Sequence, residues 1–304
     1  TVIVPVGSTE QHGPHGPLLT DALIPVEVAR RVAPRVGAVV APVVNYSLSY
    51  PHVGFTGVVH VRIPTFMALI EDLCLSLAAI GFRRIVFLNG HYDNTYAIAY
   101  ACANVADRLP ADTSAFPVNY WDGMTPDEAA EFFDPSNGLH ANKGETSAVL
   151  AIAPELVDME LANAEFPPFP SVTSPAPVHT AFFFTAPGSV HRATRSGTWG
   201  DAREATPEFG ERYLAVVTDA TVRILDDVER THRALPPRCR CVRQPSGATP
   251  TGSRRARGPA ARPWRSPRGS APTAGRSAPA SSGPRRPGRS ASSSPSPTRS
   301  CRMR

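Results

Sequence analysis

The stretch TVIVPVGSTEQHGPHGPLLTD, residues 1–21, joins an apolar run to a loop that is rich in acidic and imidazole side chains. Residues 1–6 are uniformly apolar and mostly β-branched, a pattern typical of a strand that is covered on both faces in a parallel sheet. The loop that follows holds Glu10, His12, His15 and Asp21. Because buried carboxylates without partners are costly, such a loop indicates either a metal site or a hydrogen-bonded structural loop.

Beyond this stretch, short apolar runs alternate with longer runs of helical periodicity. The short runs predict strands at residues 38–44, 83–90 and 113–121, the first two of them buried. The longer runs predict helices at residues 22–36, 64–81, 94–109, 144–154 and 207–228. This alternation predicts an α/β domain with a mainly parallel sheet.

Three segments carry side chains suited to chemistry. They supply Glu10, His12 and Asp21 from the opening loop, His91 and Asp93 from NGHYDN, and His140 and Glu145 from GLHANKGETS. Function gathers beyond the carboxyl ends of parallel strands, so we expect these residues to converge. Imidazoles and carboxylates together suit zinc or manganese, and one further carboxylate, Asp21, could bridge two such ions. Each segment alone also fits a surface turn or a helix start, so the prediction depends on their combination.

The last part of the chain differs in composition from the rest. Of the 31 basic residues, 17 are arginines from Arg233 onward, where no Asp, Glu or Lys occurs, so the preceding body has 14 basic residues against 26 acidic ones. We therefore expect a folded domain over residues 1–231 and a disordered tail, rich in Arg, Pro and Ser, over residues 232–304. The tail is either a basic arm for nucleic acid or acidic membrane, or an artefact of reading past the true end of the gene.

The cysteine content and the absence of long apolar runs bear on the cellular location of the protein. The five cysteines have no spacing typical of a disulfide framework or a structural zinc site. No apolar run is long enough to span a membrane and no signal peptide is evident, so we expect a cytoplasmic protein. The chain starts at Thr1 inside a predicted strand, so we expect that further residues precede it.

The motifs VPVGSTEQHGPH…TD, NGHYDN and H-x4-ETS resemble those of the creatininase (creatinine amidohydrolase) family. The likeness extends from residue 1 to about residue 228 and includes GFTG and GTWGDAREAT. It implies a three-layer α/β/α fold, a dinuclear zinc or manganese centre and a homo-oligomer, often a hexamer. The resemblance also implies a set of roles: one ion held by Glu10 and His91, the other by His12 and Asp93, with Asp21 bridging, His140 transferring protons and Glu145 beside it.

The chain departs from the family pattern at several positions. Asp93 stands where true creatininases have Glu, so Glu145 is an alternative ligand to Asp93. Gly16 and Leu19 stand where Leu and Gly are usual, although the spacing from Glu10 to Asp21 is unchanged. The metal ligands are therefore expected to be retained while the loop backbone differs.

The substrate side departs as well. The resemblance places Tyr92 and Trp121 beside the substrate, but Ser136 stands where creatininases have a Trp that closes over creatinine. This weakens the case for creatinine itself and leaves the case for amide hydrolysis intact. His52 is expected to flank a loop over the site or at a subunit contact, and Trp199 is expected to pack a turn.

Together these observations predict a metal-dependent hydrolase of a C–N bond in a small cyclic amide, with creatinine as the first candidate. The alternatives are another family hydrolase, acting on a formamide or a modified peptide, and a non-catalytic metal-binding oligomer. The acidic body argues against nucleic acid as a partner of the folded domain. The expected partners are a small-molecule amide and further copies of this chain. No membrane is expected as a partner.

Overall fold

The computed structural model describes residues 1–133, 137–167 and 186–235. Its main sheet has four parallel strands in the order β2-β1-β3-β4. The central strands β1 (Val2–Val6) and β3 (Arg84–Asn89) pair with each other, β2 (Val39–Val40) lies outside β1, and β4 (Ser114–Asn119) lies outside β3. The prediction of an α/β fold with a mainly parallel sheet is confirmed.

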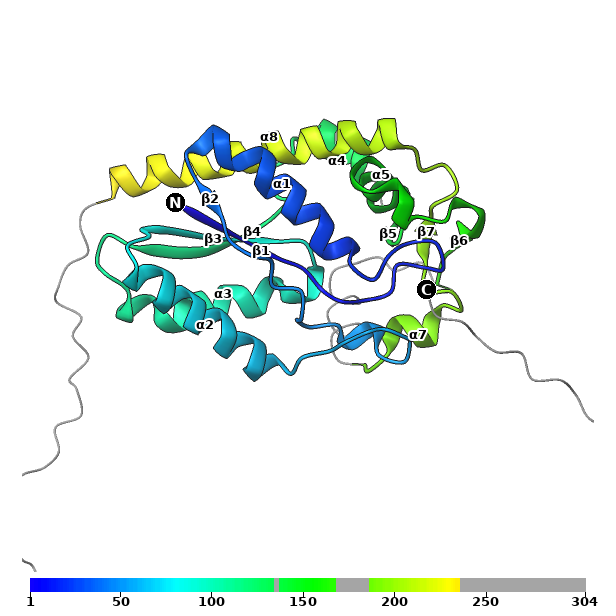
Figure 1. The fold of residues 1–304 in the computed structure, drawn as a ribbon, viewed down its shortest axis with the longest axis horizontal. Coiled ribbons are helices and arrows are strands. Elements are labelled where there is room, and N and C mark those ends of the chain that lie inside the picture. Colours follow the sequence, from blue (N-terminus) through cyan, green and yellow to red (C-terminus); the bar gives the residue numbers. More distant parts are fainter. Residues whose placement is uncertain (134–136, 168–185, 236–304) are drawn as a thin grey trace, which may run out of the picture. The chain divides into compact units, whose positions relative to one another are not determined.

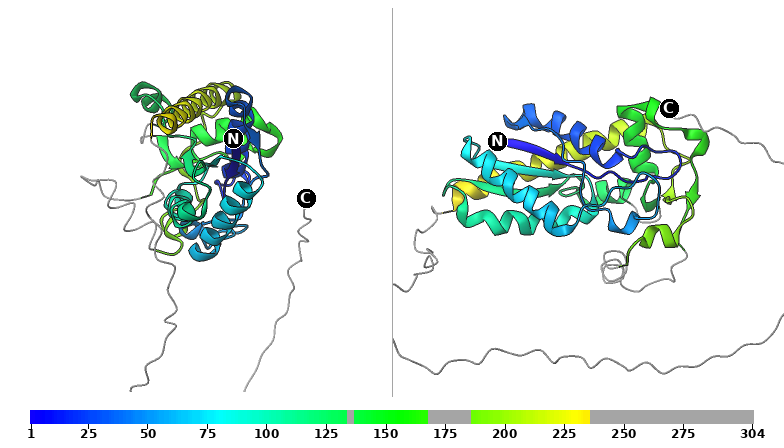
Figure 2. Two further views of the ribbon diagram at one scale, coloured as in Figure 1. Left: turned by 90° about the vertical axis from the view of Figure 1, so that its left-hand side faces the viewer. Right: turned by 60° about the horizontal axis from the view of Figure 1, so that its bottom comes forward.

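Helices cover both faces of this sheet, which gives the three layers that the resemblance implies (Figures 1 and 2). One face carries α2 (Ile63–Ala79) and α3 (Thr95–Val105). The other carries α1 (Thr20–Val36), α5 (Lys143–Ile152) and α8 (Pro207–Ala234). α8 also contacts α1 and α5 directly.

The side chains of β1 divide the core between the two faces. Val2, Val4 and Val6 pack in the core under α2 and α3, whereas Ile3 packs in the core under α1 and α8. Successive side chains of a strand point to opposite faces, so a strand that is buried on both faces must be apolar at every position. This requirement explains the continuous apolar run that opens the sequence.

One predicted strand is wrong in extent and burial. Residues 38–44 read as a buried strand, but only Val39 and Val40 form β2, and their side chains are 53% and 36% exposed. β2 lies at the edge of the sheet, and Pro42 just beyond it has no N–H to donate. An edge strand has a free outer edge and does not need to be covered on both faces. Its apolar composition therefore does not show that it is buried.

A second, small antiparallel sheet was not predicted. It has the order β5-β7-β6, with β5 at Gly138–His140, β6 at Ala164–Glu165 and β7 at Trp199–Asp201. Gly138 has φ +88° and lies so close to β7 that a Cβ there would collide with the backbone of Gly200. This sheet matters for the site because β5 ends at His140.

The remaining described elements are short. They are the helices α4 (Pro126–Phe132) and α7 (Ser189–Ala193) and the 3-10 helices η1 (Tyr50–His52), η2 (Tyr92–Asn94), η3 (Ala106–Arg108), η5 (Pro154–Leu156) and η6 (Met159–Leu161). α8 continues through Ala234, beyond the expected domain boundary at residue 231. The expected tail from residue 236 onward, and Ser136, lie outside the described residues. Within the described ranges, no helix combines the length and apolarity needed to cross a bilayer.

Candidate metal centre

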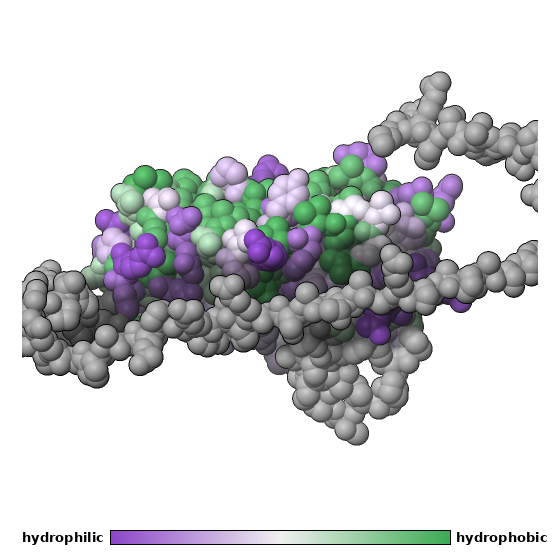
Figure 3. All heavy atoms as spheres, turned by 90° about the horizontal axis from the view of Figure 1, so that it is seen from below, coloured by the Kyte–Doolittle hydropathy of each residue, from purple (hydrophilic) through white to green (hydrophobic). Residues whose placement is uncertain are grey.

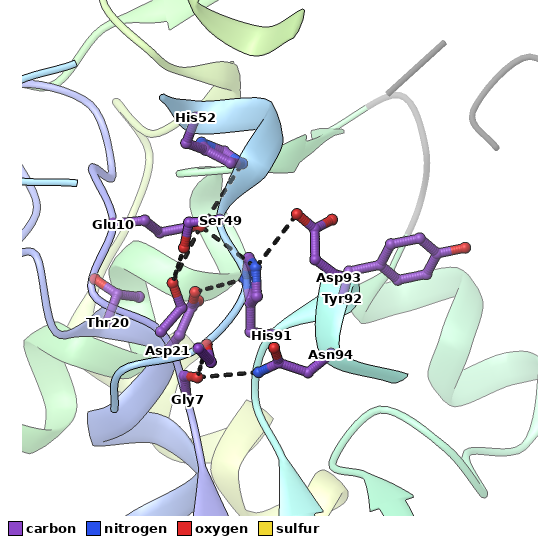
Figure 4. A network of polar contacts seen from close by, with 12 residues as sticks. Gly7, Glu10, Thr20, Asp21, Ser49, His52, His91, Tyr92, Asp93 and Asn94 are labelled. Carbon is purple, nitrogen blue, oxygen red and sulfur yellow. Dashed lines mark hydrogen bonds and ion pairs between the residues drawn. The ribbon is translucent and has the colours of Figure 1, made fainter. Parts of the chain in front are cut away.

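Acidic and imidazole side chains meet beyond the carboxyl ends of β1 and β3 (Figure 4). Glu10 and His12 lie in the loop after β1, and Asp21 lies in the first turn of α1. His91 follows β3 directly, and Asp93 lies in η2. The expected convergence at one end of the sheet is therefore the observed geometry.

Asp21 stands between two imidazoles. Its Oδ1 lies 3.1 Å from His12 Nε2, and its Oδ2 lies 2.9 Å from His91 Nδ1. Glu10 Oε2 lies 3.5 Å from His91 Nε2. All four side chains are buried, with residue exposures between 1% and 5%. One carboxylate thus faces both halves of the cluster.

Two glycines allow α1 to bring Asp21 to this position. A Cβ on Gly7, at the end of β1, would lie 2.5 Å from the carbonyl oxygen of Asp21. A Cβ on Gly90, at the end of β3, would collide with the same oxygen and with Pro25. The first turn of α1 therefore rests directly on the ends of the two central strands.

Two more carboxylates approach the cluster from opposite sides. Asp93 Oδ2 lies 3.6 Å from His91 Nε2, whereas Glu145 Oε2 lies 3.9 Å from His12 Nε2. The resemblance pairs His12 with Asp93, but here the second carboxylate beside His12, after Asp21, is Glu145, whereas Asp93 faces His91. Glu145 is oriented by the backbone N–H of Ala141, which donates to its Oε2 at 2.7 Å. The choice between Asp93 and Glu145 as ligand to the second ion stays a prediction.

Several atoms of the cluster fit a bound metal because they are buried without a hydrogen-bond partner. Among the described residues, these atoms are His12 Nε2, Asp21 Oδ2, His91 Nε2 and Asp93 Oδ2. The close approaches of Asp21 to the two imidazoles thus do not have hydrogen-bond geometry. Ligand atoms of Glu10, His12 and Asp21 lie within 4.8 Å of one another, as do those of His12, His140 and Glu145. Imidazole nitrogens and carboxylate oxygens are the donors that zinc and manganese accept.

The electrostatics indicate a cluster that needs a cation. Burial raises the pKa of Glu10 to about 8, with nearby Asp21 adding to the shift against the opposing effect of His91. Burial by itself lowers the pKa of His12, but Asp21, Glu145 and Glu10 raise it to about 9. Burial raises the pKa of Asp21, but His12 and His91 hold it well below its usual range. The metal-free cluster retains protons at neutral pH in places where divalent ions would supply the positive charge.

His140 reaches the cluster from β5 in a defined tautomer. Its Nε2 lies 2.8 Å from the carbonyl oxygen of Gln11. A carbonyl only accepts, so Nε2 carries the hydrogen and Nδ1 carries the lone pair. Nδ1 lies 3.6 Å from Glu10 Oε1, and burial, with His12 and His52 nearby, lowers the pKa of His140 well below its ordinary value. His140 therefore presents a neutral, proton-accepting nitrogen to the centre.

A chain of hydrogen bonds through Gln11 adds His52 to the site. Gln11 Oε1 accepts from the N–H of Gly13 at 2.9 Å, which fixes the amide orientation. Gln11 Nε2 then donates to Gly197 O at 3.1 Å and to His52 Nδ1 at 3.0 Å. His52 Nε2 therefore carries the hydrogen, and it lies 3.5 Å from Glu10 Oε1.

The sequence motifs gave no role to Gln11, and His52 was expected only to flank a loop over the site or at a subunit contact. The segment that leads into η1 and His52 is joined to the loop after β1 by polar contacts, including a 2.5 Å hydrogen bond between the hydroxyls of Ser8 and Ser49. Pattern reasoning cannot find such a contact because the partners are 41 positions apart. His15, in the same loop, lies 2.9 Å from Thr146 Oγ1 through its Nε2.

A cavity of about 400 Å³ opens in front of the centre. Glu10, Asp21, His91, Asp93, His140 and Glu145 line its inner end. Tyr92 and Trp121 line it as well, with ring centroids 6.3 Å apart. Trp199, expected to pack a turn, lies in β7 and also lines this cavity. The residues expected at the substrate thus border the same space as the metal cluster.

Fold and site together define an α/β protein with a buried carboxylate and imidazole centre for divalent ions. The family model Creatininase, described as creatinine amidohydrolase, matches residues 1–225. The chain therefore belongs to the creatininase family and is a hydrolase of that family.

Two relatives show the range of activities within the family. The chain is 30% identical over 233 residues to the creatinine amidohydrolase of Pseudomonas putida, a match that covers 71% of this chain and 84% of the relative. It is 35% identical over 223 residues to the mycofactocin precursor peptide peptidase of Mycolicibacterium smegmatis, a match that covers 70% of this chain and 79% of the relative. One relative acts on a small ring and the other on a peptide precursor.

Solved creatininases have the same fold. A mutant creatininase of Zn-Zn type superposes with a TM-score of 0.63 at 28% identity, covering 75% of this chain and 90% of that one. A manganese creatininase gives a TM-score of 0.63 at 29% identity, with the same coverage of 75% and 90%. The metals named for these structures match the donor set of this chain.

Proposed function

We propose that this protein is a dinuclear-metal amidohydrolase that cleaves the C–N bond of a compact amide. The observation that carries the proposal is Asp21, whose two oxygens face His12 and His91 at 3.1 and 2.9 Å. A buried carboxylate between two imidazoles, each with an unpartnered nitrogen, is suited to bridging two ions.

The cluster divides into two sets of ligands around Asp21. Glu10, His91 and Asp93 form one set, and His12 with Glu145 forms the other. Zinc and manganese are the proposed ions, supported by the donor chemistry and by the metals of the similar creatininases. Two such ions, when bound, would polarise an amide carbonyl and lower the pKa of a bound water.

His140 is the proposed proton-transfer residue. The oxygen of water forms a bond to the carbonyl carbon, and the C–N bond to the leaving nitrogen breaks. The Nδ1 lone pair of His140 accepts a proton from the attacking water and delivers it to the leaving nitrogen, so an acid and an amine result. The Gln11 carbonyl keeps the opposite nitrogen of His140 protonated at 2.8 Å and thereby maintains the useful tautomer. Glu145 lies beside this proton path.

Two substrate candidates follow from the relatives. Creatinine is the first, from the resemblance and from the 30% identity to a creatinine amidohydrolase. A peptide amide is the second, favoured by the 35% identity to a peptide peptidase. Both require the same bond cleavage, and Tyr92 and Trp121 are the proposed substrate contacts in either case.

A homo-oligomer, hexameric by resemblance, is the proposed assembly. The apolar helix α2 leaves Ile63, Leu69 and Ile80 exposed by 54%, 41% and 73%. Viewed from the side of α2 and α3, hydrophobic residues reach the surface between hydrophilic ones (Figure 3). Exposed apolar side chains along one helix support a contact between copies. Light scattering would give the mass in solution.

The test is a hydrolysis assay on purified protein together with metal analysis. We expect about two divalent ions per chain, hydrolysis of at least one member of a set comprising creatinine, simple formamides and short peptides, and loss of both on chelation. Tight metal binding without hydrolysis of any amide would instead favour a non-catalytic metal-binding oligomer. A single ion per chain would overturn the dinuclear assignment.

A further inference from the structure

The cavity in front of the centre is larger than creatinine requires. Its volume of about 400 Å³ is within the range of roughly 300–1,000 Å³ that holds drug-sized ligands. Creatinine is one small methylated ring. A substrate that filled this space would extend well beyond the amide held at the centre.

The walls of the cavity are mainly aromatic and aliphatic. Tyr92 and Trp121 form one wall, Phe132 and Phe133 contribute from α4 and the residue after it, and Trp199 contributes from the small sheet. Leu139 and Val190 also line the space. These side chains offer apolar surface in the same cavity as the acidic centre.

Away from the metal-binding cluster, the walls of the cavity carry no fixed positive charge. Among its lining residues, all of which lie in the described part of the chain, none is Lys or Arg. A carboxylate or phosphate on the substrate would therefore lose its hydration without gaining a cationic partner. Apart from the metal-binding cluster, the polar groups on the walls are neutral, such as the amide of Asn142 and the hydroxyl of Tyr120.

We propose that this cavity receives an uncharged aromatic or branched aliphatic group attached to the scissile amide, so that the preferred substrates are apolar amides larger than creatinine. This inference rests on the proposed amidohydrolase function and narrows its substrate class. Burying one aromatic ring in an apolar pocket favours binding by about tenfold to a hundredfold. We therefore expect apolar aromatic amides to be preferred over small amides by the same factor.

The test compares matched probes on the zinc- or manganese-loaded full chain. The substrates are methylformamide, benzylformamide, acetamide, phenylacetamide, creatinine and the 4-carboxy derivatives of the two aromatic amides. Of benzylformamide and phenylacetamide, we expect the better substrate to have a kcat/KM at least about tenfold higher than that of the matching small amide, methylformamide or acetamide. Its kcat/KM should exceed that of creatinine by the same factor. The added carboxylate should abolish this advantage.

Two pairs of variants locate the preference. Trp121→Ala should remove most of the aromatic advantage, whereas Tyr100→Ala, which removes an exposed ring of α3 outside the cavity, should not. Leu139→Arg places a cation at a half-exposed position of the wall. It should raise the relative kcat/KM for the carboxylated amides, whereas Leu139→Gln should not. The arginine variant tests the inference by a gain, which misfolding cannot imitate.

A binding measurement separates the inference from the function on which it rests. Calorimetry with phenylacetohydroxamic and acetohydroxamic acid compares affinities without turnover, and we expect the phenyl compound to bind at least about tenfold more tightly. If no amide is hydrolysed but this preference persists, the proposed function fails, and only the preference of the cavity for an uncharged apolar group is retained. Equal affinities, or creatinine hydrolysed faster than every aromatic amide, would overturn the inference.

Discussion

Gln11 holds His52 in one tautomer: its amide nitrogen lies 3.0 Å from His52 Nδ1, and its amide oxygen is fixed by the N–H of Gly13. His52 therefore turns a protonated Nε2 toward Glu10 at 3.5 Å. Partners of this kind orient a metal-binding carboxylate without touching the metal. Gln11 is a positioning residue in this arrangement.

Replacing Gln11 should lower activity without removing the metals. Gln11→Ala frees the His52 ring to adopt either tautomer, so we expect kcat to fall by about 10–100-fold. Gln11→Glu retains an acceptor for Gly13 but presents an acceptor to His52 Nδ1, which should shift the pH profile of kcat. The pH–rate profiles of both variants, beside their metal content, provide the check. Unchanged profiles would limit Gln11 to a structural role.

Removing Asp21 should empty the centre. Asp21→Ala takes away the one carboxylate that faces both His12 and His91, so we expect both ions and all hydrolysis to be lost. Metal analysis by mass spectrometry measures the effect. Asp219→Ala, which removes a surface carboxylate paired with Arg35, is the matched control and should retain both ions.

Removing His140 should separate turnover from metal binding. His140→Ala leaves Asp21, His12 and His91 in place, so we expect the metal content to stay and kcat to fall by about 10²–10⁴-fold. His191→Ala, at an exposed histidine, is the control. Metal loss in the His140 variant equal to that of Asp21→Ala would make His140 a ligand instead.

The metal-free protein should lose stability as the pH rises from 7 to 9. In the folded chain the pKa of Glu10 is raised from 4.5 to about 8 and that of His12 from 6.5 to about 9. Over this interval the folded state binds more protons than the unfolded state, so the free energy of unfolding falls with pH. We expect a loss of about 1–3 kcal/mol in urea unfolding of chelator-treated protein.

Metal should reverse this trend. Ions replace the retained protons, so their apparent affinity should rise between pH 7 and 9 with release of protons, measurable by calorimetry in buffers of different ionisation enthalpy. Glu10→Gln removes one titrating group and should flatten the stability profile of the metal-free chain. A metal-free stability that increased with pH would contradict the assigned directions.

Deleting residues 236–304 should leave metal content and hydrolysis unchanged. All candidate site residues precede this point, and α8 ends at Ala234. A shorter chain ending at residue 228 would lose the last turns of α8 and the ion pair of Glu229 with Arg84 at 3.1 Å, so its Tm should be lower. Any salt-sensitive binding of nucleic acid should disappear in both truncations. Loss of hydrolysis in the longer truncation alone would assign the tail a role at the site.

The sequence was sufficient to predict the parallel sheet because all of β1 and the centre of β3, residues 85–88, are apolar where helices cover both faces. It misjudged residues 38–44 because edge and central strands share a β-branched composition. The small sheet escaped prediction because its strands have two or three residues and pair with partners far along the chain, as Gly138 and Glu165 both do with Gly200. Periodicity needs longer segments than these.

The candidate site divides in the same way. Motif residues such as Glu10 and His91 could be proposed because each follows a predicted strand. His52 and Gln11 could not, since their importance depends on side-chain hydrogen bonds between loops distant in the sequence. Glu145 could be placed in the first turn of a predicted helix, but its position beside His12 could not be predicted, because the small sheet that leads into this helix was missed.

The two glycines beneath α1 have a consequence for natural variation in this family. A methyl group on Gly7 or Gly90 would push the Asp21 backbone away from the strand ends while leaving every ligand in the sequence. A homologous gene with all the metal-binding residues but with alanine at either position would therefore encode a protein whose centre is displaced. Inspection of ligand residues alone would classify that protein as active, so genome surveys of this family should include both glycines in the signature.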